Sequence, residues 1–196
     1  MRASRQERSL RIVSFESPAA FRGWLAKNHA RPDGIWLRIH KKQSSKLSVT
    51  YAQALDQALC YGWIDGQKQK FDENSWLQRF TPRRPGSAWS KINTQHAERL
   101  MKSGEMTPAG LKIIEAARLD GRWKAAYDSP GNAAAPEDFL RELNKNRKAK
   151  AFFETLNRSN VYAIVYRLQT AKRPETRARR IQQFVAMLAR NEKLHS

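Results

Sequence analysis

Apolar residues alternate with polar ones in much of the first half of the chain and recur at helical spacing in the second half. Up to residue 80 the predicted order is strand, helix, strand, helix and a hairpin of two strands. These elements are expected at 11–15, from Ser17-Pro18, at 35–39, from Thr50, and at 67–71 and 75–80. This βαβαββ order predicts an α+β fold with a small mixed or antiparallel sheet of about four strands in the N-terminal half.

Everything after Pro85 is predicted to be helical. One helix should run from Trp89 to Leu100 and another should begin at Thr107-Pro108, while 128–135 is expected to form a linker. The last helix has an apolar stripe of Ile181, Phe184, Val185 and Leu188 at i, i+3, i+4 and i+7. We therefore expect a basic arm at 1–14, an α+β domain at 15–127 and a basic helical region at 136–196.

The composition favours a folded protein in a reducing compartment. The chain has 196 residues, 40% of them hydrophobic, which suits one domain or one domain with an extension. Its single cysteine, Cys60, excludes an intramolecular disulfide. The N-terminus has no apolar run typical of a signal peptide, and no window approaches a membrane span. These features predict a cytoplasmic protein that does not insert into membranes.

The net charge of +19 is the strongest compositional signal. From Arg141 onward the sequence contains fourteen Lys and Arg residues but only four Asp and Glu residues. Such an excess favours nucleic acid, an anionic membrane face or a phosphorylated ligand, although it also suits a merely solvated basic surface. The candidate phosphate contacts in the last segment are Lys172, Arg173, Arg177, Arg179 and Arg180. The alternative is an amphipathic helix whose polar face happens to be basic.

A second cationic cluster lies in the stretch Thr81-Pro-Arg-Arg-Pro-Gly-Ser87. Two prolines hold an extended loop, and Ser87 is placed to cap the helix predicted near Trp89. Arg83 and Arg84 before such a helix start would combine guanidinium donors with free amides, which suits an anion. Arg79 joins them if its side chain faces the same way. The alternative is that these arginines pair with Asp65, Asp72 or Glu73.

The stretch Gly62-Trp-Ile-Asp-Gly66 is predicted to be a helix exit followed by a turn. That turn is either structural only or places Trp63 and Asp65 beside a ligand. In the functional interpretation Trp63 and Trp89 wall a pocket, and Asp65 orients an arginine or accepts from the ligand. The full candidate ligand set is Trp63, Asp65, Arg79, Arg83, Arg84, Ser87, Trp89, Ser90 and Asn93.

Known catalytic and metal-binding patterns do not occur. The four histidines are scattered without metal-ligand spacing, and Cys60 is better explained as a buried thiol than as a nucleophile. No phosphate loop, nucleophile elbow or dinucleotide fingerprint is found, so no cofactor or metal is predicted. An enzyme that uses Asp65 as a general acid or base is the weakest alternative. The sequence does not indicate an oligomeric state.

The chain resembles the YdeI/OmpD-associated family, also called bacteriocin-protection proteins. Four stretches carry the resemblance: 50–67 (TYAQALDQALCYGWIDGQ), 79–93 (RFTPRRPGSAWSKIN), 104–123 (GEMTPAGLKIIEAARLDGRW) and 171–181 (AKRPETRARRI). The resemblance implies a part in tolerating bacteriocins or antimicrobial peptides, but no activity, cofactor or catalytic residue. Because most such peptides are cationic, a protein of charge +19 would repel them. Any protection would therefore act through an anionic ligand, nucleic acid or an internal partner.

Overall fold

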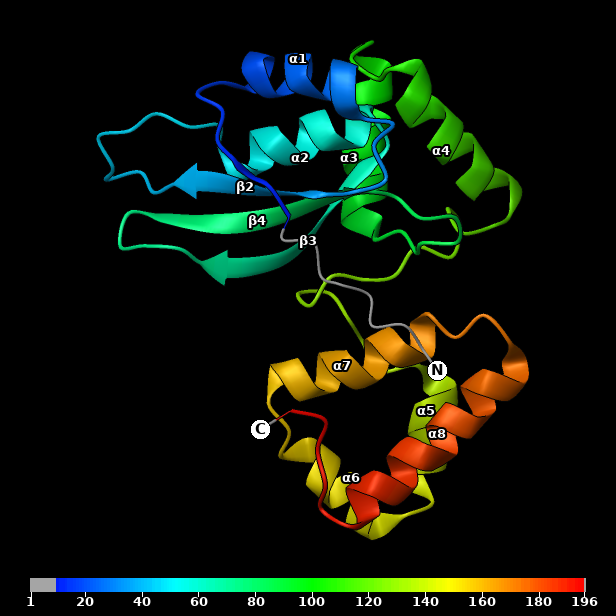
Figure 1. Cartoon of the computed structure of the whole chain (residues 1–196). Helices are drawn as coiled ribbons and strands as arrows, with labels where there is room; N and C mark the ends of the chain where they lie inside the picture. The colour runs from blue at the N-terminus through cyan, green and yellow to red at the C-terminus, as the bar shows by residue number, and fades with distance from the viewer. Residues whose placement is uncertain (1–9, 196) are drawn as a thin grey trace, which may run out of the picture. The chain divides into compact units, whose positions relative to one another are not determined.

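The computed structural model describes residues 10–195, which fall into two compact units (Figure 1). The first unit contains the chain up to residue 87 together with 95–121, and the second contains 88–94 together with the chain from 122 onward. Most of the arm predicted at 1–14 lies outside the described residues. Each unit has its own hydrophobic core.

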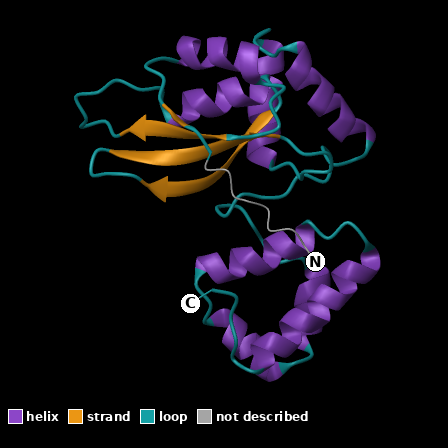
Figure 2. Cartoon of the chain, viewed as in Figure 1, coloured by secondary structure: helices purple, strands orange, loops and turns teal. Residues whose placement is uncertain are grey.

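Four strands form one mixed sheet in the first unit, in the spatial order β1-β2-β4-β3 (Figure 2). Strand β1 (Ile12–Val13) is parallel to β2 (Ile35–His40), and β4 (Ser75–Pro82) is antiparallel to both β2 and β3 (Trp63–Lys70). Parallel neighbours need a crossover connection, which helix α1 (Pro18–Asn28) supplies. The predicted element order and the α+β class are confirmed.

Local capping signals determine where three helices of this unit begin. Ser17 caps α1, and Thr107 caps α4 (Pro108–Leu119) through a side-chain hydrogen bond from a first-turn amide. Thr50 and Gln53 form the predicted capping box before α2 (Tyr51–Cys60). Because these signals are local, the sequence alone predicted all three starts.

Helix α3 (Lys91–Lys102) begins later than the sequence predicts. The hydroxyl of Ser90, not of Ser87, accepts the capping hydrogen bond, from the N–H of Asn93 at 3.2 Å. The N–H of Ser87 donates to the carbonyl of Arg84 at 3.0 Å instead. The prediction that Ser87 caps this helix is wrong, because the proline-rich loop completes a turn of its own before the helix starts.

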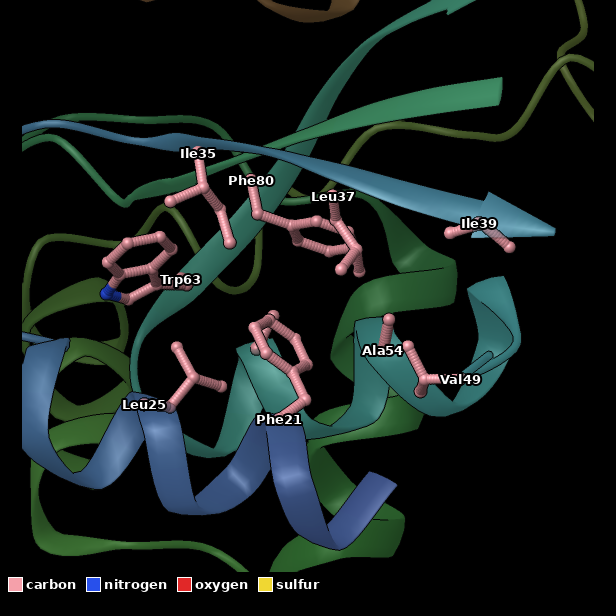
Figure 3. Packing of buried hydrophobic residues seen from close by; sticks show 10 residues of the cluster. Phe21, Leu25, Ile35, Leu37, Ile39, Val49, Ala54, Trp63 and Phe80 are labelled. Atoms are coloured by element: carbon pink, nitrogen blue, oxygen red, sulfur yellow. The ribbon is translucent and has the colours of Figure 1, made fainter. Parts of the chain in front are cut away.

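The core of the first unit lies between one face of the sheet and helices α1 and α2 (Figure 3). Ile35, Leu37 and Ile39 point inward from β2, as the two-residue period of a strand requires. Phe21 and Leu25 of α1 meet them from the other side. Each of these five side chains is at most 3% exposed, so each burial contributes about 1.5–3 kcal/mol.

The hairpin of β3 and β4 contains a β-bulge. Gly66 and Gln67 together lie opposite the single residue Arg79 on β4, so β3 carries one extra residue. The side-chain amide of Gln78 donates to the carbonyl of Gly66 at 2.9 Å and to that of Gln67 at 3.3 Å, which satisfies two backbone acceptors at the bulge. The turn predicted at Asp65-Gly66 is wrong, because β3 runs through both residues.

Helices dominate the second unit: α5 (Glu137–Asn144), α6 (Arg147–Glu154), α7 (Arg158–Gln169) and α8 (Pro174–Ala189). The predicted apolar stripe of α8 is confirmed, since all four of its members are buried. They pack in one cluster with side chains of α5, α6 and α7; the buried residues of this cluster are Phe139, Leu143, Ala149, Ile164, Leu168, Ile181, Phe184, Val185 and Leu188. Across residues 10–195, no helix has both the length and the apolar character needed to cross a bilayer.

Candidate anion-binding site

Arg79 lies on β4 with its backbone paired to Trp36 of β2. Its aliphatic stem passes over Gly66, where an added Cβ would lie 3.7–3.9 Å from the Arg79 side chain. The Nε atom of Arg79 is buried and has no hydrogen-bond partner. Asp65 is paired with the neighbouring residue Phe80, so Asp65 and Arg79 face opposite sides of the sheet. Asp65 therefore cannot orient Arg79 as the sequence suggested.

The two adjacent arginines after β4 differ sharply in exposure. Arg83 is 6% exposed, and its backbone N–H donates to the carbonyl of Gly62 at 3.0 Å. Arg84 is exposed to solvent. Adjacent residues in an extended segment point to opposite sides, which accounts for the difference. Of the pair, Arg84 is the one whose guanidinium solvent can reach.

Two of the three carboxylates that the sequence offers as partners for these arginines are engaged by other residues. The hydroxyl of Tyr51 donates to Asp65 at 2.8 Å. The guanidinium of Arg38 donates to Asp72 at 2.6 Å. Burial, together with the Asp65 charge, raises the pKa of Tyr51, so the phenol keeps its proton and the hydrogen bond persists. Within residues 10–195, the side chains of Arg79 and Arg84 form no hydrogen bond and no ion pair.

Trp63 is a core residue and not the pocket wall that the sequence suggested. Its side chain is completely buried in the cluster between sheet and helices (Figure 3). Its indole N–H donates to the carbonyl of His29 at 2.8 Å, and its ring meets Trp24 edge-on at 5.8 Å. Trp63 thus fixes the start of β3 from inside the unit.

Three of the predicted ligand residues belong to the second unit. Trp89 is 2% exposed, with its ring 4.8 Å from that of Trp123. The hydroxyl of Ser90 accepts from the N–H of Asn93, and the N–H of Lys91 donates to the carbonyl of Tyr127 at 2.9 Å. Two amides at the start of α3 are therefore engaged within the protein, which weakens the predicted role of this helix start.

The basic segment at the start of α8 divides into structural and exposed cations. Arg177 donates two hydrogen bonds to Asp138, at 2.6 and 2.8 Å, and one to the carbonyl of Leu168 at 2.6 Å. Arg180 donates to the carbonyl of Arg167. These two arginines tie α8 to α5 and α7. The exposed members of the predicted set are Lys172, Arg173 and Arg179.

Cys60 is completely buried at the end of α2. Burial raises the pKa of its thiol, and thiolate is the reactive form, so the interpretation of Cys60 as an inert structural thiol is supported. Its carbonyl accepts hydrogen bonds from the N–H of Thr107 at 3.2 Å and from the Thr107 hydroxyl at 2.5 Å. In the described part of the chain, no group of three or more His, Cys, Asp or Glu side chains is arranged to hold a metal ion.

Sequence reasoning missed two surface hollows. One, of about 420 Å³, lies between α5 and α8 and contains the Arg177–Asp138 pair. The other, of about 400 Å³, lies beside the turn of the β3–β4 hairpin; its lining residues are Lys41, Lys68, Lys70, Asp72, Ser75 and Trp76. The alternation Gln-Lys-Gln-Lys at 67–70 predicted a strand, but it could not show which face the lysines occupy.

The structure defines a protein with an α+β unit built on a four-stranded mixed sheet and a second, mainly helical unit. Residues 13–113 match a family described as a domain of unknown function (DUF8412), and because the match spans more than half of the sequence, the chain belongs to that family. Residues 132–191 match the family described as Bacteriocin-protection, YdeI or OmpD-Associated, which confirms the resemblance for the second unit. No curated protein and no solved structure matches the chain.

Proposed function

We propose that the protein binds a phosphate- or carboxylate-bearing ligand without catalysing its conversion, and that Arg79 and Arg84 are the anchors. One observation carries this proposal: among residues 10–195 neither the Arg79 nor the Arg84 side chain forms a hydrogen bond or an ion pair, and the buried Nε atom of Arg79 has no partner. A guanidinium with no internal counter-ion favours an external anion, because its donor fork matches carboxylate and phosphate oxygens.

The match of the second unit supports a link to bacteriocin or stress tolerance. A net charge of +19 disfavours direct capture of cationic peptides, so protection would act through the anionic ligand. The single buried cysteine supports a reducing compartment, and we place this activity in the cytoplasm.

Isothermal titration calorimetry with anions that carry no nucleobase tests the arginine site. We expect pyrophosphate or citrate to bind the native protein, and the double variant Arg79→Gln with Arg84→Gln to bind roughly a hundredfold more weakly, since each charge-assisted contact accounts for about tenfold. The matched control is Arg11→Gln with Arg31→Gln, which removes the same charge from exposed positions of the same unit. Unchanged affinity in the first variant, or an equal loss in the control, refutes the proposal.

A second candidate function is nucleic-acid binding by the exposed cations near the start of α8. It is favoured by the exposure of Lys172, Arg173 and Arg179 in a segment with few acidic residues. Replacing all three by Gln should reduce the slope of log affinity against log salt on duplex DNA by about 2.7, at about 0.9 per phosphate contact. A flat salt response of the native protein would exclude this function.

A further inference from the structure

The hollow beside the turn of the β3–β4 hairpin is lined by lysines and by one aromatic ring. Lys41, Lys68 and Lys70 line it together with Trp76, and its volume of about 400 Å³ suits a small ligand. All of its lining residues belong to the first unit. It is separate from the arginine site, because Trp76 and Arg79 face opposite sides of the sheet.

The β-bulge creates this hollow. Directly opposed residues of an antiparallel pair share a face, and beyond the bulge Lys70 is paired with Trp76 and Lys68 with Gln78. Without the extra residue the alternation would place both lysines on the other face of the sheet. The amide of Gln78, whose residue is 4% exposed, holds the bulge by donating to the carbonyls of Gly66 and Gln67. Gln78 therefore acts as a positioning residue for the two lysines.

The positive charge of the hollow is not neutralised from within. Asp72 is its one acidic lining residue, and Asp72 is already engaged by Arg38 at 2.6 Å and by the hydroxyl of Ser75 at 2.7 Å. Among the described residues, the side chains of Lys41, Lys68 and Lys70 form no ion pair. Three ammonium groups are thus available to anionic oxygens. By contrast, the hollow between α5 and α8 pairs Arg177 with its own carboxylate.

Trp76 adds a second element of recognition. Its half-buried ring is packed against the core of the unit from behind, and the Nζ atom of Lys68 lies 4.9 Å from the ring centroid. A tryptophan ring beside ammonium groups offers a planar surface for a base and donors for its phosphate. The ammonium of Lys68 lies over the ring in a cation–π contact that leaves its charge unneutralised, so a base that stacks on Trp76 takes its place while the ammonium turns to the phosphate.

We propose that this hollow binds a nucleotide unit, with the phosphate at Lys41, Lys68 and Lys70 and the base against Trp76. The nucleotide is either free or part of a single strand. Both sources present the same chemistry, and each makes a distinct prediction.

The proposal is tested by titrating AMP and, separately, inorganic phosphate into the full-length protein. Calorimetry measures the affinity, and the indole N–H signal of Trp76 in NMR reports binding at the hollow. AMP should bind more tightly than phosphate and shift that signal. Lys68→Gln with Lys70→Gln should weaken AMP binding roughly tenfold or more. The matched control, Lys148→Gln with Lys150→Gln, removes two exposed lysines at the same spacing from α6 and should leave AMP affinity unchanged.

The source of the nucleotide follows from a parallel titration with oligothymidylate. If a single strand is the ligand, it binds more tightly than AMP, and the Lys68 and Lys70 variant lowers the salt slope by about 1.4, at about 0.7 per contact. The double variant Arg79→Gln with Arg84→Gln should preserve the AMP-induced shift of the Trp76 signal. A negative result for the arginine site therefore does not affect this test of the hollow. No AMP binding, AMP binding no tighter than phosphate, or an equal loss in the control would overturn the proposal.

Discussion

Gly110 lies in the first turn of α4, where that helix meets the end of α2. A Cβ at this position would overlap the carbonyl oxygen of Cys60 and would lie 2.9 Å from its carbonyl carbon and 2.6 Å from the sulfur of Met106. The methionine can rotate away. The carbonyl cannot, because it accepts both the N–H and the hydroxyl of Thr107. Gly110→Ala must therefore push the two helices apart.

The magnitude follows from opposing effects. Replacing a helical glycine by alanine favours the helix by about 1 kcal/mol, whereas overpacking a rigid contact costs about 1–3 kcal/mol. Stretching the two Thr107 hydrogen bonds adds about 1 kcal/mol for each. We expect Gly110→Ala to lower the free energy of unfolding by about 2–4 kcal/mol. Gly23 in α1 is the matched control, since its added Cβ would meet no atom within 4 Å beyond its chain neighbours and the backbone of its own helix, and Gly23→Ala should stabilise by up to about 1 kcal/mol.

Urea unfolding followed by far-UV circular dichroism measures both variants, with stability compared through midpoints at unchanged slope. Hydrogen–deuterium exchange of peptides from α2 and α4 assigns the change to the first unit, and faster exchange there is expected for Gly110→Ala. A Gly110→Ala protein as stable as the native one would refute the close approach of these helices. The same conclusion would follow if the two alanine variants changed stability equally.

Further outcomes concern the second unit and the thiol. The hydrogen bonds from Arg177 hold the pKa of Asp138 below its ordinary value, so the pair stabilises the folded state above about pH 4 and loses this effect as pH falls through the lowered pKa. Asp138→Asn should cost about 0.5–1 kcal/mol at neutral pH, because the pair is partly exposed, and nothing near pH 2, as thermal unfolding across pH would show. Leu188→Ala, at a completely buried position, should cost about 2–5 kcal/mol in urea unfolding. Cys60 should react with Ellman's reagent only at the rate of unfolding, and rapid labelling of the native protein would contradict its burial.

Local chemistry explains what the sequence could predict. A capping residue such as Thr50 acts on amides within its own first turn, and the inward residues of β2 follow a period of two. The same locality explains the errors. Ser87 and Ser90 are equally good caps by composition, but the N–H of Lys91 is bound by the carbonyl of Tyr127, a contact far along the chain that favours a later start of the helix.

The sequence did not predict the β-bulge, for a related reason. Gly66 follows an aspartate, and that pair is a common turn signal, so the residues that widen β3 were assigned to a turn. The extra residue becomes visible only through the register with β4 and through Gln78, which hydrogen-bonds to it from the partner strand. A one-residue insertion reverses the faces of all later residues, and for this reason the cationic hollow could not be found from the pattern of 67–70 alone.

The total charge says less about function than the pairing of each cation. Arg177 and Arg180 belong to the most basic stretch of the sequence, yet both bind acceptors within the second unit and contribute to its stability. Lys68 and Lys70 lie in an unremarkable polar segment, yet the bulge presents them to solvent without carboxylate partners. A ligand gains most from cations that folding leaves uncompensated, because no internal ion pair must be broken before it binds. By this criterion the sheet of the first unit, rather than the cation-rich α8, is where an anionic ligand is expected to bind.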